Sequence, residues 1–232
     1  GRMPSVIGDI LIALDEVQAL SDFCVVGTHA LFAYEALAAV EFKIELLASG
    51  DVDLLYDNRR SLSIVAKKMD NQGLLGLLKK VDKSFEIKTF ERFRAVNKDG
   101  FMVDMITQDR GMHVAKPEAI TAGDFELVEV PNLEWLVNAP KINPVAISAN
   151  GQPVMMPVPD PRAFAIHKAW LSKQPDREPA KKTRDLGQAV MLFALLQEYL
   201  PNFPMDQQQM KYFPRDVVKK ALHDLNFHLN QV

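Results

Sequence analysis

The sequence predicts an α+β or α/β fold, in which helices flank a mixed sheet and a C-terminal helical bundle follows. Three observations predict it. As far as residue 159, short apolar runs typical of strands alternate with segments of helical periodicity. The proline-rich segment 157–161 then interrupts the chain, and every periodic segment beyond it is helical. We therefore expect a sheet-containing domain over residues 1–159 and a helical domain over residues 160–232.

The first third of the chain contains two short apolar runs separated by helical segments. Apolar residues at helical spacing predict a helix over residues 5–20. The run 23–26 is predicted as a buried strand that ends at Gly27, and a helix with Thr28 as its N-cap is expected over residues 28–40. The same patterns predict a strand over residues 51–56 and helices over residues 61–70 and 72–81.

A tight turn is predicted in the middle of the chain. Asp99-Gly100 is typical of a two-residue hairpin turn, and apolar runs over residues 91–96 and 101–106 supply the two strands. Further short strands are expected over residues 125–130 and 134–137.

A second turn, at residues 150–151, joins predicted strands over residues 145–147 and 154–158. Pro153 and Pro157 place this ribbon at a sheet edge, because proline has no N–H group to donate within a sheet. The remaining periodic segments predict helices over residues 162–172, 179–199 and 214–229.

The charge distribution is uneven although the total is small. The net charge of −3 over 232 residues gives no sign of a strongly basic nucleic-acid-binding protein. Residues 160–232 nevertheless carry 11 Lys and Arg against 8 Asp and Glu, so the rest of the chain is acidic. An acidic part beside a mildly basic part suits a metal site that faces a phosphate-binding surface, and it also arises by chance.

The single cysteine, Cys24, lies in an apolar run and predicts neither a disulfide nor a cysteine zinc site. It fits a reducing compartment. No uncharged apolar run approaches the roughly 18 residues that a membrane span requires. We therefore expect a cytoplasmic protein without a membrane partner.

The acidic strand over residues 51–56 is the most informative segment. Alternate side chains of a strand share a face, so Asp51 and Asp53 project together. Two adjacent carboxylates repel each other unless a cation neutralises them, and Mg²⁺ prefers carboxylate oxygens. The alternative is an exposed edge strand whose acids are solvated.

A third acid, Asp104, lies within the apolar run 101–106, where an unpaired charge costs several kcal/mol. Such an acid meets either a metal or a basic side chain, and Arg92 and Arg94 are candidates for the latter. Three acids on neighbouring strands suit two metals and in-line phosphoryl transfer.

Candidate phosphate ligands lie on both sides of these acids. Gly27 and Thr28 stand at a strand-to-helix junction, where glycine lets a phosphate approach free backbone N–H groups. Arg59 follows the acidic strand, and Lys168 lies on the first predicted helix of the C-terminal part. The alternative for the basic residues is a solvated helix face.

These segments resemble the minimal nucleotidyltransferases of the DNA polymerase β-like superfamily, among them bacterial "nucleotidyltransferase fold" proteins and the nucleotidyltransferase toxins of abortive-infection and toxin–antitoxin systems. The superfamily pattern is a Gly followed by Gly or Ser, a helix, an Asp-x-Asp strand and a later Asp on a strand. The matching residues here are Gly27, Asp51, Asp53 and Asp104.

Two positions differ from the superfamily pattern. Thr28 stands where Gly or Ser is usual, and Ala48-Ser49-Gly50 replaces the Thr or Arg that usually precedes the acidic strand. The C-terminal part is again similar, with a Lys168-containing helix before a helix that begins near residues 184–186.

The resemblance implies a polymerase β-like mixed sheet and a site that holds Mg²⁺ or Mn²⁺. Asp51 and Asp53 would bind both metals and the nucleotide phosphates. Asp104 would complete the site and help to deprotonate the acceptor. The expected reaction transfers a nucleoside monophosphate from an NTP such as ATP to a hydroxyl group of tRNA, of a protein or of a small molecule. A nucleotide-binding or interaction module without catalysis is the alternative.

Overall fold

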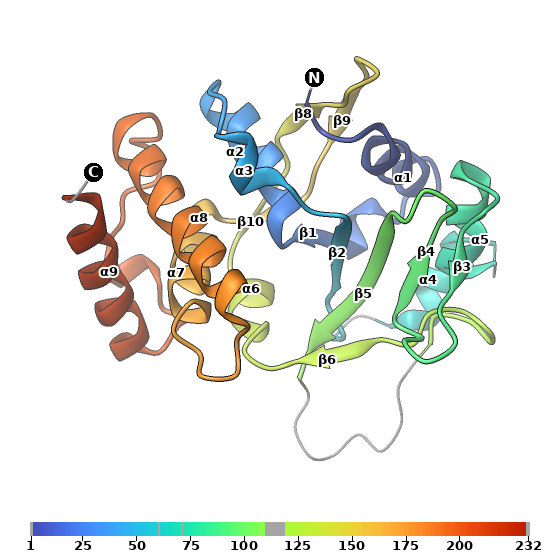
Figure 1. The fold of residues 1–232 in the computed structure, drawn as a ribbon. Coiled ribbons are helices and arrows are strands. Elements are labelled where there is room, and N and C mark those ends of the chain that lie inside the picture. Colours follow the sequence, from blue (N-terminus) through green and yellow to red (C-terminus); the bar gives the residue numbers. More distant parts are fainter. Residues whose placement is uncertain (1, 60, 71, 110–118, 231–232) are drawn as a thin grey trace.

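The computed structural model describes residues 2–59, 61–70, 72–109 and 119–230. The helices over residues 5–16 and 73–81 lie on one side of the central sheet and the three C-terminal helices on the other, whereas the short helix over residues 44–47 packs beside the C-terminal helices (Figure 1). Within these ranges, no helix is both long enough and apolar enough to span a membrane. In chain order the elements are α1 (Ser5–Glu16), η1 (Leu20–Asp22), β1 (Phe23–Val26), η2 (Thr28–Ala30), α2 (Leu31–Ala38), α3 (Ile44–Leu47), β2 (Asp51–Tyr56), α4 (Leu62–Lys68), α5 (Gly73–Val81), β3 (Glu86–Ile87), β4 (Arg94–Val96), β5 (Met102–Gln108), β6 (Val128–Val130), α6 (Glu134–Asn138), β7 (Lys141–Ile142), β8 (Val145–Ile147), β9 (Pro153–Met155), β10 (Val158–Pro159), α7 (Pro161–Leu171), α8 (Pro179–Glu198), η3 (Gln207–Gln209) and α9 (Arg215–Leu229).

The main sheet is mixed, as the sequence predicts. Its strand order is β1-β2-β5-β4-β3, and β6 also pairs with β5. The two central strands, β2 and β5, run parallel, whereas β1 is antiparallel to β2 and β4 is antiparallel to β5. β4 pairs with the first part of β5 and β6 with the last part, so the two share one edge of that strand.

Side chains that alternate along the central strands enter two different hydrophobic clusters. Leu54 of β2 and Met105 of β5 belong to a cluster that includes buried residues of α1 and α5. Leu55 and Ile106, one residue further on, belong to a second cluster with buried residues of α6, α7, α8 and α9. Because the side-chain period of a strand is two, the acids at positions 53 and 104 share the face that the C-terminal helices cover.

The expected boundary after residue 159 coincides with the junction of β10 and α7. The Asp160 carboxylate caps α7 by accepting a hydrogen bond from the Arg162 backbone N–H at 2.9 Å. Both hydrophobic clusters continue across this junction: Phe164 belongs to the first cluster and Phe193 to the second. The C-terminal helices therefore complete the core of the sheet.

Three expectations need correction. Residues 134–137 form part of helix α6, not a strand, because a short apolar run fits a buried helical turn as well as a strand. Thr28 opens the 3₁₀ turn η2 and does not cap it with its side chain. The ribbon of β8 and β9 forms a sheet of its own, although the Pro157 carbonyl accepts a hydrogen bond from the Val25 N–H of β1 at 2.7 Å.

The predicted hairpin turn is present at residues 97–100. Gly100 has a φ of +79°, which glycine adopts without strain. The Asn97 side-chain oxygen accepts hydrogen bonds from the N–H groups of Asp99 and Phe101 at 3.1 and 2.8 Å.

Candidate active site

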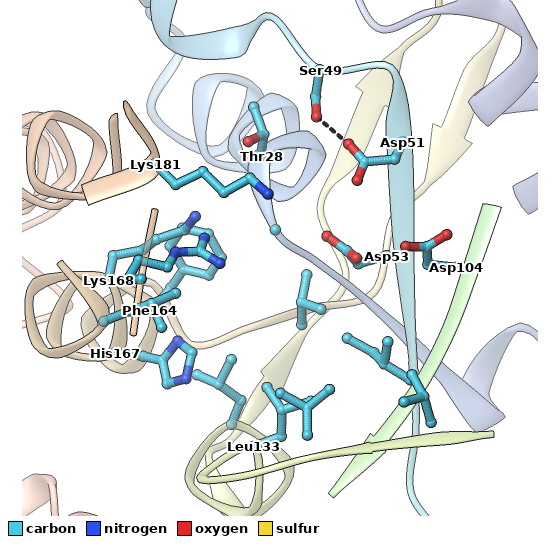
Figure 2. A pocket seen from close by; sticks show the side chains of 18 of the residues that line it. Thr28, Ser49, Asp51, Asp53, Asp104, Leu133, Phe164, His167, Lys168 and Lys181 are labelled. Carbon is cyan, nitrogen blue, oxygen red and sulfur yellow. Dashed lines mark hydrogen bonds between the residues drawn. The ribbon is translucent and has the colours of Figure 1, made fainter. Parts of the chain in front are cut away.

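The parallel pairing of β2 and β5 brings three carboxylates together. Asp53 and Asp104 are directly opposite each other in the register, and Asp51 lies two residues earlier on the same face of β2. One carboxylate oxygen from each of the three lies within 4.8 Å of the other two. We call Asp51, Asp53 and Asp104 the acidic cluster. Figure 2 shows their carboxylates turned into a common pocket.

Each carboxylate of the acidic cluster has a different environment. The Ser49 hydroxyl donates a hydrogen bond to Asp51 at 2.5 Å. Burial raises the pKa of Asp53 to about 7, and the negative charges of Asp51 and Asp104 contribute to the rise. Asp104 is the most buried of the three, at 4% exposed. Ser49 lies in the segment where the superfamily usually has a Thr or an Arg, and it was not among the predicted site residues.

Asp104 also has the arginine partner that the sequence left open as an alternative. Arg94, on the adjacent strand β4, donates from Nε to one carboxylate oxygen at 2.6 Å and from Nη2 to the other at 2.5 Å. The register sets Arg94 opposite Asp104. Each oxygen of a carboxylate has two lone pairs, so this bidentate pair still leaves one acceptor site on each oxygen. The structure therefore confirms the arginine partner and leaves the Asp104 oxygens able to accept a cation as well, while the metal itself stays a prediction.

The donor set of the acidic cluster fits a hard divalent cation. Three carboxylates face one guanidinium, so the cluster retains an excess of negative charge that burial makes costly. Oxygen-only ligands suit Mg²⁺ and Mn²⁺.

Gly27 holds the backbone against the acidic cluster. Its φ is +66°, and a Cβ atom at this position would lie 2.1 Å from an Asp53 carboxylate oxygen. The next residue, Thr28, is buried, and its hydroxyl accepts a hydrogen bond from the Gln188 side-chain N–H at 3.2 Å. His29 is tied to the Asp51 carbonyl through Nδ1 at 2.8 Å. The segment that follows β1 therefore packs directly against β2.

Four basic side chains line the pocket across from the acidic cluster, and we call them the basic wall. They come from α7, from the loop before α8 and from the first turns of α8, and they are Lys168, Arg177, Lys181 and Arg184. Figure 2 shows Lys168 and Lys181 extending toward the side of the pocket that carries Asp51 and Asp53.

A buried carboxylate supports two members of the basic wall. Asp185 is fully buried and accepts from Lys168 Nζ at 2.6 Å and from Arg177 Nε at 2.8 Å. Burial by itself would raise the pKa of Asp185, but the charges and hydrogen bonds of Lys168 and Arg177 hold it below its ordinary value. Burial likewise lowers the pKa of Lys168 although Asp185 opposes this. Lys168 therefore reaches the pocket as part of an ion-paired network.

Arg59 lies elsewhere. It follows the end of β2 opposite to Asp51, and its guanidinium donates to both carboxylate oxygens of Asp57 at 2.8 and 2.7 Å and to Asn138 at 2.8 Å. It is not among the residues that line the pocket. The structure thus brings Gly27, Thr28 and Lys168 to the acidic cluster but does not bring Arg59.

The pocket has a volume of about 380 Å³ and a second, apolar end. We call this part the apolar end. It is formed by β5, β6, α6 and α7, and its residues are Ile106, Val128, Val130, Leu133, Leu136 and Leu171. His167 of α7 also lines the pocket, and Figure 2 shows it away from the three carboxylates, on the same side as Leu133. Arg177 and His167 were not expected in the site: Arg177 lies in a loop without periodicity, and His167 has no metal-ligand spacing.

Comparisons with known proteins address the family. A crystal structure of an antigenic nucleotidyltransferase-like protein from Paracoccidioides brasiliensis is 16% identical, with a TM-score of 0.38 over 89% of this chain and 93% of that chain. No curated protein matches the sequence. The model of a family described as Nucleotidyltransferase matches residues 5–213. Since this match spans most of the 232 residues, the chain belongs to that nucleotidyltransferase family.

Proposed function

We propose that this protein is a divalent-metal-dependent nucleotidyltransferase. It transfers a nucleoside monophosphate from an NTP to a hydroxyl acceptor and releases pyrophosphate. The observation that carries the proposal is the convergence of Asp51, Asp53 and Asp104, whose oxygens lie within 4.8 Å of one another. The family match and the basic wall on the facing side of the same pocket support it.

In the proposed reaction, the acceptor oxygen forms a bond to the α-phosphorus and the bond from that phosphorus to the bridging oxygen breaks. Pyrophosphate leaves with that oxygen, and the acceptor proton passes to a carboxylate of the acidic cluster. When bound, divalent ions supply the positive charge that holds the phosphates and favours ionisation of the acceptor hydroxyl. Lys168 and Lys181 supply fixed positive charge for the departing phosphates.

Gly27 and Ser49 position the acidic cluster for this reaction. The absent Cβ at Gly27 leaves room for the Asp53 carboxylate, and the Ser49 hydroxyl fixes that of Asp51. A carboxylate that is held in place before the substrate arrives costs no reorganisation during the reaction.

The test is an incubation of the protein with Mg²⁺ and NTPs labelled at the α-phosphate, in turn with total cellular RNA, cell protein and small hydroxyl compounds. We expect label on one acceptor class and stoichiometric pyrophosphate. Asp53→Ala should reduce transfer by about a hundredfold or more. Asp15→Ala, at an exposed position of α1, is the matched control and should retain it. An unchanged rate in the Asp53 variant contradicts the proposal.

The acceptor class decides between forms of the activity. Label on tRNA supports the toxin-type reaction, in which case an antitoxin is the partner to seek. Label on protein or on a small molecule excludes it.

A second function, nucleotide binding without turnover, is favoured by one observation. Arg94 already occupies one side of the Asp104 carboxylate with two hydrogen bonds. Calorimetric binding of Mg²⁺ and NTP, with neither label transfer nor pyrophosphate release for any acceptor, would select this function.

A further inference from the structure

The lining of the pocket changes from charged to apolar residues within a short distance. Asp104 and Ile106 lie on the same face of β5, so the step from the acidic cluster to the apolar end is two residues, or roughly 7 Å. On α7, Phe164, His167, Lys168 and Leu171 line the pocket at the spacing of one helix face. Lys168 on this stripe belongs to the basic wall, whereas Leu171 belongs to the apolar end.

His167 is the polar side chain on the apolar part of that stripe. It is 7% exposed and makes no hydrogen bond with any residue that the structure describes. Its ring is held instead by aromatic contacts, with centroids 6.4 Å from Trp135 and 5.9 Å from Trp170. The two ring nitrogens are not among the described side-chain atoms that are both fully buried and unpaired, so they face the open space of the pocket. A polar group that faces a pocket without a protein partner is available to a ligand that pairs with it.

The protonation state of His167 restricts the kind of ligand group that it can bind. Burial lowers its pKa to about 3, and the neighbouring Lys168 charge adds to the effect. At neutral pH the imidazole is therefore uncharged, with one N–H donor and one nitrogen acceptor. A phosphate is bound better by the basic wall than by an uncharged imidazole. A flat, uncharged heterocycle with hydrogen-bond donors and acceptors on its edge suits an apolar surface that contains a single neutral imidazole.

We propose that the apolar end receives the nucleobase of the NTP and that His167 hydrogen-bonds the edge of the base and sets base preference. This inference rests on the proposed function. It places the phosphates between the acidic cluster and the basic wall, and the base beside Leu133 and Leu171. His167 is thereby a specificity-determining residue that takes no part in the bond changes.

The test measures binding rather than turnover. Dissociation constants for ATP, GTP, CTP and UTP, and for inorganic tripolyphosphate as a probe without a base, are measured by calorimetry with Mg²⁺. The wild-type protein should prefer at least one base. His167→Phe keeps an aromatic ring against Trp135 and Trp170 but removes both hydrogen-bonding nitrogens. It should weaken the preferred NTP by about tenfold, the worth of one neutral hydrogen bond, and reduce the discrimination among bases.

A second variant tests the location independently of the hydrogen bond. Leu171 is partly exposed at the end of α7, so Leu171→Trp fills the apolar end from its rim with little risk to the core. It should weaken all four NTPs and leave tripolyphosphate within about twofold of wild type. His223→Phe, on the exposed face of α9 with 81% of its side chain accessible, is the matched control and should leave every constant unchanged.

The outcomes separate this inference from the proposed function. Wild-type affinities and base ratios in His167→Phe, together with normal NTP binding in Leu171→Trp, overturn the inference and leave the proposed function standing. Equal loss of tripolyphosphate and NTP binding in both variants also overturns it, because the phosphates then occupy the apolar end. A wild-type protein that binds no NTP overturns the proposed function and this inference with it.

Discussion

At the scale of single residues, the geometry of the site depends on a glycine, Gly27, because a side chain at this position would collide with the acidic cluster. Gly27 turns the chain from β1 into η2 directly against the Asp53 carboxylate. The positive φ and the close approach act together, since each alone disfavours a Cβ atom there. From the sequence we expected Gly27 to let a phosphate approach the backbone. In the structure, the group that lies against Gly27 is the Asp53 carboxylate of β2.

Gly27→Ala should therefore disrupt the site more than the fold. We expect a loss of stability of about 1–3 kcal/mol from the strained backbone and a displaced Asp53 carboxylate, with loss of Mg²⁺-dependent NTP binding. Gly100→Ala is the control: it has a φ of +79° but nothing within 4 Å of its Cβ position. It should cost comparable stability in urea unfolding and leave NTP binding intact. Equal effects of the two variants on binding would refute the steric argument.

His167 should couple stability to pH. Its pKa is about 3 in the folded protein, because burial disfavours the charged ring, and about 6.5 when unfolded. Above pH 6.5 both states are neutral and its contribution is fully present. As the pH falls below 6.5, only the unfolded state gains the proton, so stability declines by up to about 1.4 kcal/mol per pH unit. Urea unfolding between pH 7.5 and 5 should show a shallower decline in His167→Phe than in wild type or His223→Phe. Parallel curves would contradict the low pKa.

At the scale of elements, the period of the strands made the acidic cluster predictable. Asp51 and Asp53 share a face because they are two residues apart, and an acid in the apolar run of β5 needed a cationic neighbour. The sequence left Arg92 and Arg94 as candidates for a basic neighbour, and the register of β4 with β5 selects Arg94 by setting it opposite Asp104. Arg59 lies outside this pocket for a related reason: nearness in sequence to β2 does not fix the direction in which the chain leaves the strand.

The structure of loops and of short apolar segments was harder to predict from the sequence than that of the strands. Arg177 belongs to the basic wall, yet nothing in the periodicity of its loop marks it. The α6 segment has three buried apolar residues in succession, a pattern common to strands and helical turns. In both cases tertiary contacts decide the structure, and local sequence does not contain them.

The buried Asp185 should hold α7 and α8 together. Asp185→Asn leaves Lys168, which is 5% exposed, without its closest counter-charge, so we expect a loss of roughly 3 kcal/mol or more in urea unfolding. Asp224→Asn is the matched control, because it breaks the partly exposed pair with Lys173. Its cost should stay below about 1 kcal/mol. A loss in Asp185→Asn no larger than in this control would show that the buried pair adds little.

At the scale of the whole molecule, the site lies where sheet and C-terminal helices meet. The acidic cluster belongs to β2 and β5, while the basic wall belongs to α7, α8 and the loop between them. The strand face that carries Asp53 and Asp104 continues into Leu55 and Ile106, which pack under the same helices. A division of the chain at residue 159 therefore separates two halves of one pocket and divides both hydrophobic clusters.

This shared core predicts how the chain unfolds. Without residues 160–232, side chains such as Leu55 and Ile106 would lose the partners supplied by Phe193 and its neighbours. Exposing such apolar area costs about 25 cal/mol per Å², so the sheet alone should not be stable. We expect the full chain to unfold in one transition, with calorimetric and van't Hoff enthalpies in agreement. We also expect residues 1–159 alone to lack a cooperative transition. Two separate transitions in the full chain, or cooperative unfolding of the isolated 1–159 segment, would instead mean that the sheet and the C-terminal helices are independent domains that only meet at the pocket.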